Sequence, residues 1–316
     1  MSSFIVQQAG MLSLLQDAGR FGAHHIGLTT GGPVDKLAFK WANRLCSNEL
    51  DATTIEITLG GIELIAQGKS KIAVTGADVP LTINGKMKAL WRSHYVNDGD
   101  VINLGFASKG MRAYLAVTGG FQVKASFGSA ATVCREKIGG LDGGKLNAGN
   151  VLAITAVDPA RINSSNVILV EKHRPTYSTD IVLRTILGYQ QQNFSALAKQ
   201  LFFNSEFTVS EHCDRMGYRL NGEKISANIE GILSEGICAG AIQIPADGQP
   251  IVLLNDRQTI GGYPKIGSVI ALDTAKLAQL GQGAKISFAQ ISIEDAHNIN
   301  HLAQCLFYNT QLQQCD

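Results

Sequence analysis

Residues 54–85 read TIEITLGGIELIAQGKSKIAVTGADVPLTING and hold short apolar runs punctuated by glycine. Short runs rich in β-branched side chains and bounded by glycine or asparagine are typical of β-strands joined by tight turns. Asn84-Gly85 is a hairpin signal, because both residues tolerate the left-handed backbone that such turns need. The runs therefore predict strands at Thr54–Leu59, Ile62–Ala66, Lys71–Thr75 and Leu81–Ile83.

The same pattern continues on both sides of this stretch. Residues 4–15 alternate loosely and predict two more strands, while a helix is predicted to begin at Pro33 and run to about Cys46. Such short strands with few helices favour barrels or sandwiches over a doubly wound sheet. Further strands are predicted at Val101–Leu104, Arg112–Val117, Val151–Ile154, Val167–Val170, Ile181–Leu187 and Ile286–Ile291, further helices at Phe194–Phe203, Thr274–Leu280 and Glu294–Phe307, and a frayed tail after them.

The length of the chain favours two domains. It has 316 residues, of which 45% are hydrophobic, and single cores stop growing at roughly 250–300 residues. A polar stretch from Ala156 to Asp180 is the best boundary, because two X-Pro pairs and a Ser-Ser pair interrupt the strand pattern there. We therefore expect an N-terminal domain at residues 1–165 and a C-terminal domain at residues 166–316.

Charge and cysteine usage exclude several classes of protein. The chain has 27 Lys and Arg residues and 26 Asp and Glu residues, so its positive and negative charges nearly cancel. Proteins that bind nucleic acids or charged membrane surfaces typically carry an excess of basic residues, which this chain lacks. The six cysteines show no CxxC or Cys/His spacing, so no metal site is expected and a reducing compartment is indicated. With no signal peptide and no apolar run of membrane-spanning length, the cytoplasm is the expected location.

Two motifs suggest cofactor chemistry without supporting it. Gly139–Lys145 satisfies the GxxxxGK pattern of a phosphate loop, but Leu146 stands where the Mg²⁺-binding hydroxyl belongs, so a surface loop is expected. The Met87-Lys88 pair is like that of biotin attachment sites, yet it follows the Asn84-Gly85 turn and is better explained as a hairpin. No biotin is expected on this chain.

The segment Asp214–Leu220, DRMGYRL, is more informative. In an extended chain Arg215, Gly217 and Arg219 share one face. Two guanidinium groups with glycine between them leave room for a planar anion, which arginine holds bidentately. The alternative is a solvated strand face with a local Asp214–Arg215 pairing.

The segment Ser234–Lys265 carries polar side chains inside apolar strands. Burying such groups is costly unless they pair with one another or with a ligand, so the segment is either a hairpin with an internal polar network or a site for a small amide or carboxylate. Gly261-Gly262 before Tyr263 allows close backbone approach to a bound molecule. The interrupting polar residues are Gln243, Asn255, Arg257, Gln258 and Thr259.

Many motifs in order resemble the KipA family, also described as allophanate hydrolase subunit 2-like or biotin-dependent carboxyltransferase-like proteins. Its bacterial members include the C subunit of ATP-dependent 5-oxoprolinase, and the resemblance runs from about Leu14 to about Ala296. The motifs include LQDAGRFG from Leu15, IEITLGG from Ile55, VTGAD from Val74, RAYLAVTGG from Arg112, DRMGYRL from Asp214, AIQIP from Ala241 and DGQPI from Asp247.

The resemblance implies a mainly β fold with two cyclophilin-like β-barrel domains and a few short helices. It also implies a KipI-like B subunit and a LamB/YcsF-like A subunit as partners. The assembly would use ATP together with Mg²⁺ to open the lactam of 5-oxoproline and give glutamate. The partner subunits would bind most of the ATP. Two alternatives are a non-catalytic regulator that binds a KipI-like inhibitor of a sensor kinase, and the carboxyltransferase half of a biotin-dependent urea carboxylase-like enzyme.

Lactam opening needs groups that bind an anion, read an amide and handle a proton. Arg215, Arg219 and Arg257 are candidates for the first task, and Gln243, Asn255 and Gln258 for the second. Asp214, Asp35 or Glu235 can orient water or act as the base. We predict Asp214, Arg215, Arg257 and Asp35 as catalytic residues, no metal ligands, and as substrate-binding residues Arg219, Gln243, Asn255, Gln258, Thr259, Gly261, Gly262 and Tyr263.

Two positions depart from the pattern of the family. Gly31 stands where relatives carry a serine, and Ala130-Ala131 stands where they carry Arg-Ser. If that arginine binds an anion in relatives, activity in this chain is altered. The second domain is then expected to carry more of the site.

Overall fold

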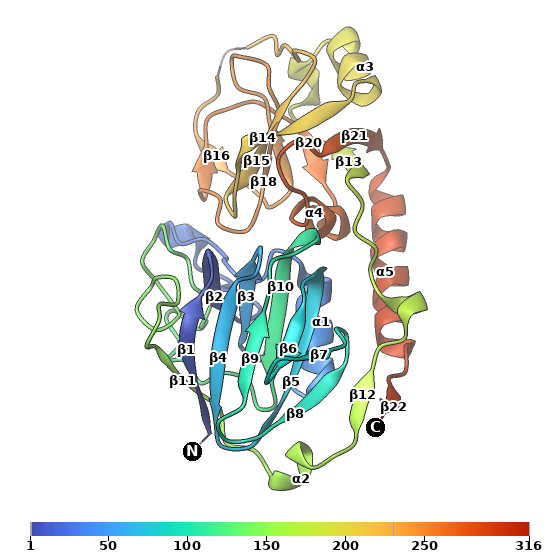
Figure 1. Ribbon diagram of the computed structural model, residues 1–316. Helices are drawn as coiled ribbons and strands as arrows, with labels where there is room; N and C mark the ends of the chain where they lie inside the picture. The colour runs from blue at the N-terminus through green and yellow to red at the C-terminus, as the bar shows by residue number, and fades with distance from the viewer. Residues whose placement is uncertain (1, 230, 316) are drawn as a thin grey trace. The chain divides into compact units, whose positions relative to one another are not determined.

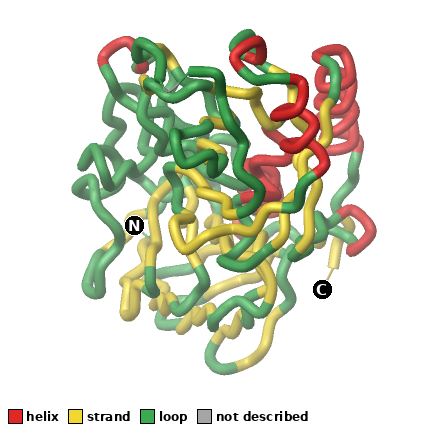
Figure 2. Tube along the Cα trace, turned by 90° about the horizontal axis from the view of Figure 1, so that it is seen from above, coloured by secondary structure: helices red, strands yellow, loops and turns green. Residues whose placement is uncertain are grey.

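A computed structural model describes residues 2–229 and 231–315 of the chain. Strands and loops make up most of the trace and helices are few (Figure 2). The expected mainly β fold is confirmed, and the chain divides into two compact units. The first unit takes the described residues of Met1–Gly22, Gly31–Tyr177 and Thr310–Asp316, and the second takes Ala23–Thr30 and Ser178–Asn309.

Two large antiparallel sheets form most of the first unit (Figure 1). Apolar side chains from both sheets make one core. Phe4 and Leu64 enter this core from one sheet and Ile57 and Leu115 from the other, all without exposed surface. One sheet has the order β11 (Val151–Ala153), β1 (Ser3–Ala9), β4 (Ile62–Gln67), β9 (Val101–Leu104), β6 (Leu81–Ile83) and β7 (Lys86–Lys88). The other has the order β2 (Leu12–Gln16), β3 (Thr54–Thr58), β10 (Lys109–Val117), β5 (Ser70–Asp78) and β8 (Ser93–Val96).

Helix α1 (Lys36–Leu45) packs against β5 and β10, so that these strands are covered on both faces. The helix begins after the predicted Pro33 start, because the carboxylate of Asp35 accepts a hydrogen bond from the Ala38 backbone N–H at 3.0 Å and caps the first turn. A second oxygen of Asp35 accepts a bond from the Tyr177 hydroxyl at 2.8 Å. Asp35 is only 2% exposed, so both contacts anchor the helix start.

A closed barrel of seven strands forms the core of the second unit (Figure 1). Helix α3 (Ala196–Asn204) closes one side of it, where Phe202 stacks on Phe288 with ring centroids 4.3 Å apart. Outside the barrel lie the short pair β16 (Glu235–Gly236) and β19 (Ile260–Gly261), and the helices α4 (Ala271–Leu277) and α5 (Ile293–Asn309). In barrel order the strands are β13 (Asp180–Leu187), β20 (Lys265–Val269), β17 (Ala241–Gln243), β18 (Ile251–Leu253), β15 (Gly217–Asn221), β14 (Phe207–Cys213) and β21 (Lys285–Gln290).

Three details differ from the sequence-based expectations. The first unit holds two open sheets rather than a closed barrel, because no strand of the described chain joins their edge strands into one ring. The boundary expected at 165/166 lies inside the first unit, since β12 (Asn166–Ile168) bridges to Arg92. The C-terminal tail does not fray, because β22 (Gln313–Cys315) pairs with β12.

Among the described residues, no helix is long and apolar enough to cross a membrane.

A buried carboxylate links α4 to the barrel and makes its stability dependent on pH. Asp273 is fully buried and accepts bonds from Arg184 Nε and Nη2, both at 2.7 Å, while Lys276 Nζ lies 2.9 Å away. Burial by itself raises the pKa of Asp273, but hydrogen bonds from Arg184 and Lys276 outweigh it and lower that pKa below its usual value. The carboxylate therefore stabilises the fold above the unfolded pKa of roughly 4 and loses that contribution as the pH falls through the folded value.

We expect Asp273→Asn to lower the free energy of unfolding by about 2 kcal/mol at neutral pH, because charge-assisted bonds from Arg184 are weakened. Urea unfolding of both proteins at pH 7 and at about pH 3 measures this difference. The gap should narrow at the lower pH, because the unfolded carboxyl is then protonated and the charge of Asp273 contributes less to folding. An equal gap at both pH values would show that charge at Asp273 does not contribute.

Candidate functional site

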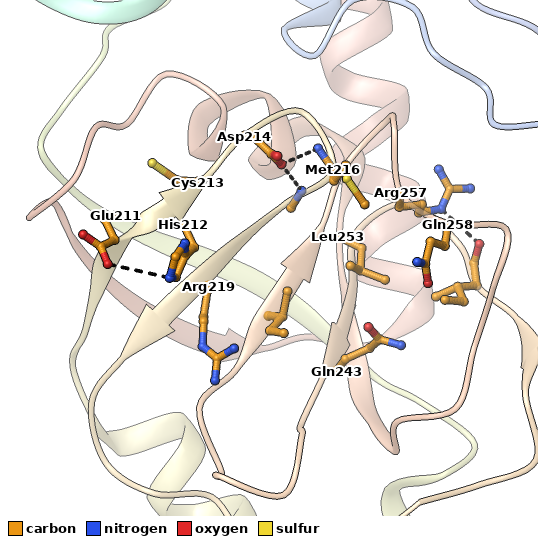
Figure 3. A pocket seen from close by; sticks show the side chains of 13 residues that line it. Glu211, His212, Cys213, Asp214, Met216, Arg219, Gln243, Leu253, Arg257 and Gln258 are labelled. Atoms are coloured by element: carbon orange, nitrogen blue, oxygen red, sulfur yellow. Dashed lines mark hydrogen bonds and ion pairs between the residues drawn. The ribbon is translucent and has the colours of Figure 1, made fainter. Parts of the chain in front are cut away.

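A pocket lies on the outer face of the barrel wall in the second unit (Figure 3). Strand pairing sets Gly217 opposite Leu253, and Ile251 opposite both Arg219 and Gln243. Because side chains alternate between faces of a strand, these residues share one face of the wall. The residues between them, such as Tyr218 and Val252, are fully buried in the barrel interior.

The pocket has a volume of about 480 Å³, within the range of small-molecule sites. Its floor is apolar, since Ile237 and Leu253 form a small buried cluster against which Ile251 packs. In Figure 3, Glu211 and His212 lie at one end and Arg257 and Gln258 at the other, with Leu253 between them. The polar residues that line it are Glu211, His212, Asp214, Arg219, Gln243, Arg257 and Gln258.

Asp214 closes the hairpin between β14 and β15. Its carboxylate oxygen Oδ1 accepts hydrogen bonds from the backbone N–H groups of Met216 at 2.7 Å and Gly217 at 3.2 Å. The backbone N–H of Asp214 in turn donates to the Gly217 carbonyl at 3.2 Å. Such side-chain capping shapes the turn, so Asp214 has a positioning role at the pocket rim.

Arg215 points away from the pocket and forms a buried ion pair with Asp256. Arg215 Nε and Nη2 each lie 2.9 Å from a different carboxylate oxygen of Asp256, and the side chains are 5% and 8% exposed. The prediction that Arg215 shares a face with Gly217 and Arg219 is therefore wrong. The cause is the Asp214 turn, which replaces an extended chain at this position, whereas Gly217 and Arg219 do share the outer face.

Arg257 is a buried residue of the pocket lining, and its guanidinium has N–H groups that make no hydrogen bond to the described residues. Its side chain is 4% exposed, with Nε donating to the Ile237 carbonyl at 3.0 Å and Nη1 to the Leu254 carbonyl at 3.3 Å. Nη2 makes no hydrogen bond to any residue that the structure describes. Burial lowers the pKa of the Arg257 guanidinium, as expected for a cation held without a counter-charge. An anion in the pocket would supply that counter-charge.

Gln243 is the second buried polar group in the pocket lining. It is 6% exposed, and its amide has no hydrogen-bond partner among residues 2–229 and 231–315. A Cβ added at Gly261 would lie 2.7 Å from Gln243 Nε2 and 2.4 Å from Ile237 Cδ1, so glycine is needed there for protein packing. A ligand amide in the pocket could satisfy both the donor and the acceptor of the Gln243 side chain.

Arg219 and Gln258 sit at more exposed positions of the same pocket. The guanidinium of Arg219 pairs with the carboxylate of Asp247, and both side chains are more than a third exposed. Exposed pairs of this kind contribute little to stability. Arg219 is therefore available to re-orient toward a ligand.

Glu235 anchors a polar network outside the pocket lining. Its Oε1 accepts hydrogen bonds from Tyr189, Lys265 and, at 2.6 Å, from Gln190 Nε2. The bonds from Lys265 and Tyr189 lower the pKa of the Glu235 carboxyl, and the bond to Glu235 raises the pKa of Tyr189. This network satisfies its own members, as expected for an internal polar hairpin.

The pocket brings together only part of the predicted site. Asp214, Arg219, Gln243, Arg257 and Gln258 line it. Asp35 is buried at the start of α1 in the first unit, and the other predicted residues do not line the pocket. Those others are Arg215, Asn255, Thr259, Gly261, Gly262 and Tyr263.

Sequence reasoning missed the Glu211-His212-Cys213 run that precedes the Asp214 turn. His212 Nε2 lies 3.7 Å from Glu211 Oε1, and both side chains are 73% exposed at the pocket mouth. A His beside a carboxylate directly before a family motif is a signal that could have found them. Among the described residues there is no cluster of three or more His, Cys, Asp or Glu side chains that could hold a metal.

Comparisons with known proteins give consistent matches. A family model described as carboxyltransferase domain, subdomain A and B, matches residues 26–290. The 5-oxoprolinase C subunit of Haemophilus influenzae is 36% identical over 89% of this chain and 89% of its own length, and that of Escherichia coli K12 is 34% identical over 92% and 91%. The crystal structure of the K. lactis urea amidolyase superposes with a TM-score of 0.90 at 27% identity, over 98% of this chain but 20% of that one.

Proposed function

Because the chain belongs to the carboxyltransferase domain family, subdomain A and B, we propose that it is the C subunit of an ATP-dependent 5-oxoprolinase. The resemblance drawn from the sequence motifs is confirmed by this membership. Two bacterial 5-oxoprolinase C subunits match this chain over about nine-tenths of both lengths. The proposed reaction converts 5-oxoproline, ATP and two molecules of water to glutamate, ADP and phosphate.

The observation that carries the proposal is that Arg257 and Gln243, both mostly buried, line one pocket, where neither Arg257 Nη2 nor the Gln243 amide has a hydrogen-bond partner among the described residues. 5-Oxoproline carries a carboxylate and a lactam on one small ring. A guanidinium is suited to the carboxylate, and a primary amide can both donate to the lactam C=O and accept from its N–H. The apolar floor at Ile237 and Leu253 fits the ring methylenes.

Residues at the other end of the pocket are suited to proton handling. His212 and Glu211 lie at the mouth, where a histidine beside a carboxylate can act as a general base. Asp214 holds the turn that presents Gly217 and Arg219, so it acts through geometry. In this assignment the substrate is bound by Arg257, Arg219, Gln243 and Gln258. Arg215 lies outside the pocket lining and has a positioning role.

A carboxyltransferase role is the second candidate, because the chain superposes on part of a urea amidolyase. That relative is a much longer chain, of which this one covers 20%. Relatives of matched length are the 5-oxoprolinase C subunits, so lactam hydrolysis is favoured. A regulator role has no comparable support.

The proposal extends to partners and location. A C subunit works with a KipI-like B subunit and a LamB/YcsF-like A subunit, and part of the ATP site lies in those partners. All six cysteines are free thiols, which fits the reducing cytoplasm. We further propose that both units are variants of the cyclophilin-like barrel, closed in the second unit and opened into two sheets in the first.

Reconstitution tests this function. The purified chain, combined with its B and A partners, should release glutamate from 5-oxoproline only when ATP is present. The matched control omits this chain and should abolish release. A complete complex that hydrolyses no 5-oxoproline, yet carboxylates urea when supplied with carboxybiotin, would replace the proposal with the second candidate.

A further inference from the structure

A second pocket, of about 640 Å³, lies entirely within the first unit and has no role in the site described above. Its walls are the end of β5, the β6–β7 hairpin, the start of β10 and the extended segment after the 3-10 turn η2 (Glu171–His173). Its size lies in the range of sites for cofactor-sized molecules.

Three cationic side chains converge on this pocket from separate elements. They are Lys88 on β7, Lys109 on β10 and Arg174 after η2, and none forms an ion pair with a residue that the structure describes. The two carboxylates in the lining are Asp78, which accepts a bond from the Ser108 hydroxyl at 2.9 Å, and Glu171. The positive groups thus outnumber the negative ones, and the surplus favours an anion.

Arg174 is held in a fixed orientation. Its Nε donates to the Leu169 carbonyl at 2.8 Å, while its two Nη groups make no hydrogen bond to the described part of the chain. Burial lowers the pKa of Arg174, which reflects a guanidinium removed from water without full compensation. Anchoring through Nε leaves the Nη pair free for bidentate binding of a phosphate or carboxylate.

Part of the pocket lining is apolar, and hydrogen bonds through Leu169 connect one of its residues, Trp91, to Arg174. Trp91 is 5% exposed and has a backbone φ of 59°, a left-handed conformation that is strained for a bulky residue. Its N–H donates to the Val74 carbonyl at 2.8 Å, and its carbonyl accepts from the Leu169 N–H at 2.9 Å. Leu169 therefore links Trp91 to Arg174. Near Trp91, Met87 lines the pocket although 69% of its surface is exposed, as does Pro80.

We propose that this first-unit pocket binds a nucleoside triphosphate, with the base on the apolar wall of Met87 and Pro80 and the phosphates on Lys88, Lys109 and Arg174. An apolar surface beside a cluster of unpaired cations matches the two halves of such a ligand. The pocket and its charges stand on the structure alone, whereas the choice of ATP rests on the proposed function. The phosphate-loop-like segment Gly139–Lys145 plays no part, because the next element after it is strand β11 rather than a helix.

Calorimetric titration of the full-length chain with a non-hydrolysable ATP analogue tests binding directly. Arg174→Ala and Lys109→Ala should each raise the Kd at least about 10-fold, as loss of a charge-assisted contact does. Lys172→Ala is the matched control, because Lys172 is an exposed cation on η2 that does not line the pocket, and its Kd should not change. Lys109 is exposed, so its variant carries no folding risk.

Titrations with two further ligands separate the contribution of the phosphates from that of the nucleoside. Inorganic triphosphate alone and adenosine alone should both bind more weakly than the analogue. Equal affinity for inorganic triphosphate would reduce the site to an anion pocket and overturn the nucleotide assignment, and tighter binding of 5-oxoproline at this pocket would overturn it as well.

The reconstituted complex separates this inference from the proposed function. Arg174→Ala should raise the KM for ATP about 10-fold with little change in the KM for 5-oxoproline. If the complexes carrying Arg174→Ala or Lys109→Ala release glutamate with an unchanged KM for ATP, the nucleotide site is wrong and the proposed function stands. If the chain binds the ATP analogue but the complex has no 5-oxoprolinase activity, the nucleotide site stands and the proposed function is wrong.

Discussion

Arg257→Ala is expected to lower kcat/KM of the reconstituted complex for 5-oxoproline by about 100-fold or more. Arg257 is 4% exposed and lines the pocket, and its Nη2 has no hydrogen-bond partner among the described residues. Truncating a buried charge that pairs with a ligand typically costs about 2–5 kcal/mol, and 3 kcal/mol is roughly a 100-fold loss. Steady-state glutamate release, measured across substrate concentrations, checks the value.

Arg219→Ala is the matched control for this prediction. Arg219 lines the same pocket but is partly exposed and already paired with Asp247, so its removal should cost less than about 10-fold and act on KM. Arg257 also donates to the carbonyls of Ile237 and Leu254, so a melting curve must show that its variant remains folded. Equal effects of both variants, or wild-type kcat/KM for Arg257→Ala, would contradict the role given to Arg257.

The strands of the first unit could be predicted from the sequence because their signals are local. Alternating β-branched residues bounded by glycine place β3, β4, β6 and β9 within a residue or so of the predicted ends. Strand β8 was missed, because its sequence SHYV carries no alternation between apolar and polar residues. The tail strand β22 was missed for a different reason, since polar QQC is ordered only by pairing with β12.

The site was only partly predictable, because its geometry depends on contacts between distant segments. The interrupting polar residues of Ser234–Lys265 indicated the right part of the chain, and Gln243 and Arg257 do line the pocket. The Asp214 turn carries no Asn-Gly or Asp-Gly signal, so the segment appeared extended and Arg215 appeared to face outward. Its partner Asp256 is 41 residues away, and no local pattern reports such a pairing.

The Arg215–Asp256 pair connects the two segments that build the pocket. Beside the ion pair, the Asp256 N–H donates to the Arg215 carbonyl at 2.9 Å and the Leu254 N–H donates to the Met216 carbonyl at 2.8 Å. These bonds fix the Asp214 turn against residues 254–257. Arg257 follows directly in the same segment, so its orientation depends on this connection.

Removing one partner of this pair should destabilise the second unit strongly. Arg215→Ala or Asp256→Ala removes one half of a buried ion pair, a change that typically costs about 3–5 kcal/mol, or about 10 °C in Tm. The double variant Arg215→Met with Asp256→Leu removes both charges and should recover most of that loss. Differential scanning calorimetry of the three proteins measures it, and single variants that melt with the wild type would contradict the assignment.

The double variant also decides whether Arg215 takes part in the reaction. The two backbone hydrogen bonds do not depend on either side chain, so the pocket should persist when both charges are removed. If Arg215 only positions Arg257, glutamate release should return together with the melting temperature. Restored stability with activity still lost by about 100-fold or more would show that the guanidinium itself acts on the substrate. The buried, bidentate geometry with Asp256 favours the first outcome, because it leaves Arg215 directed away from the pocket.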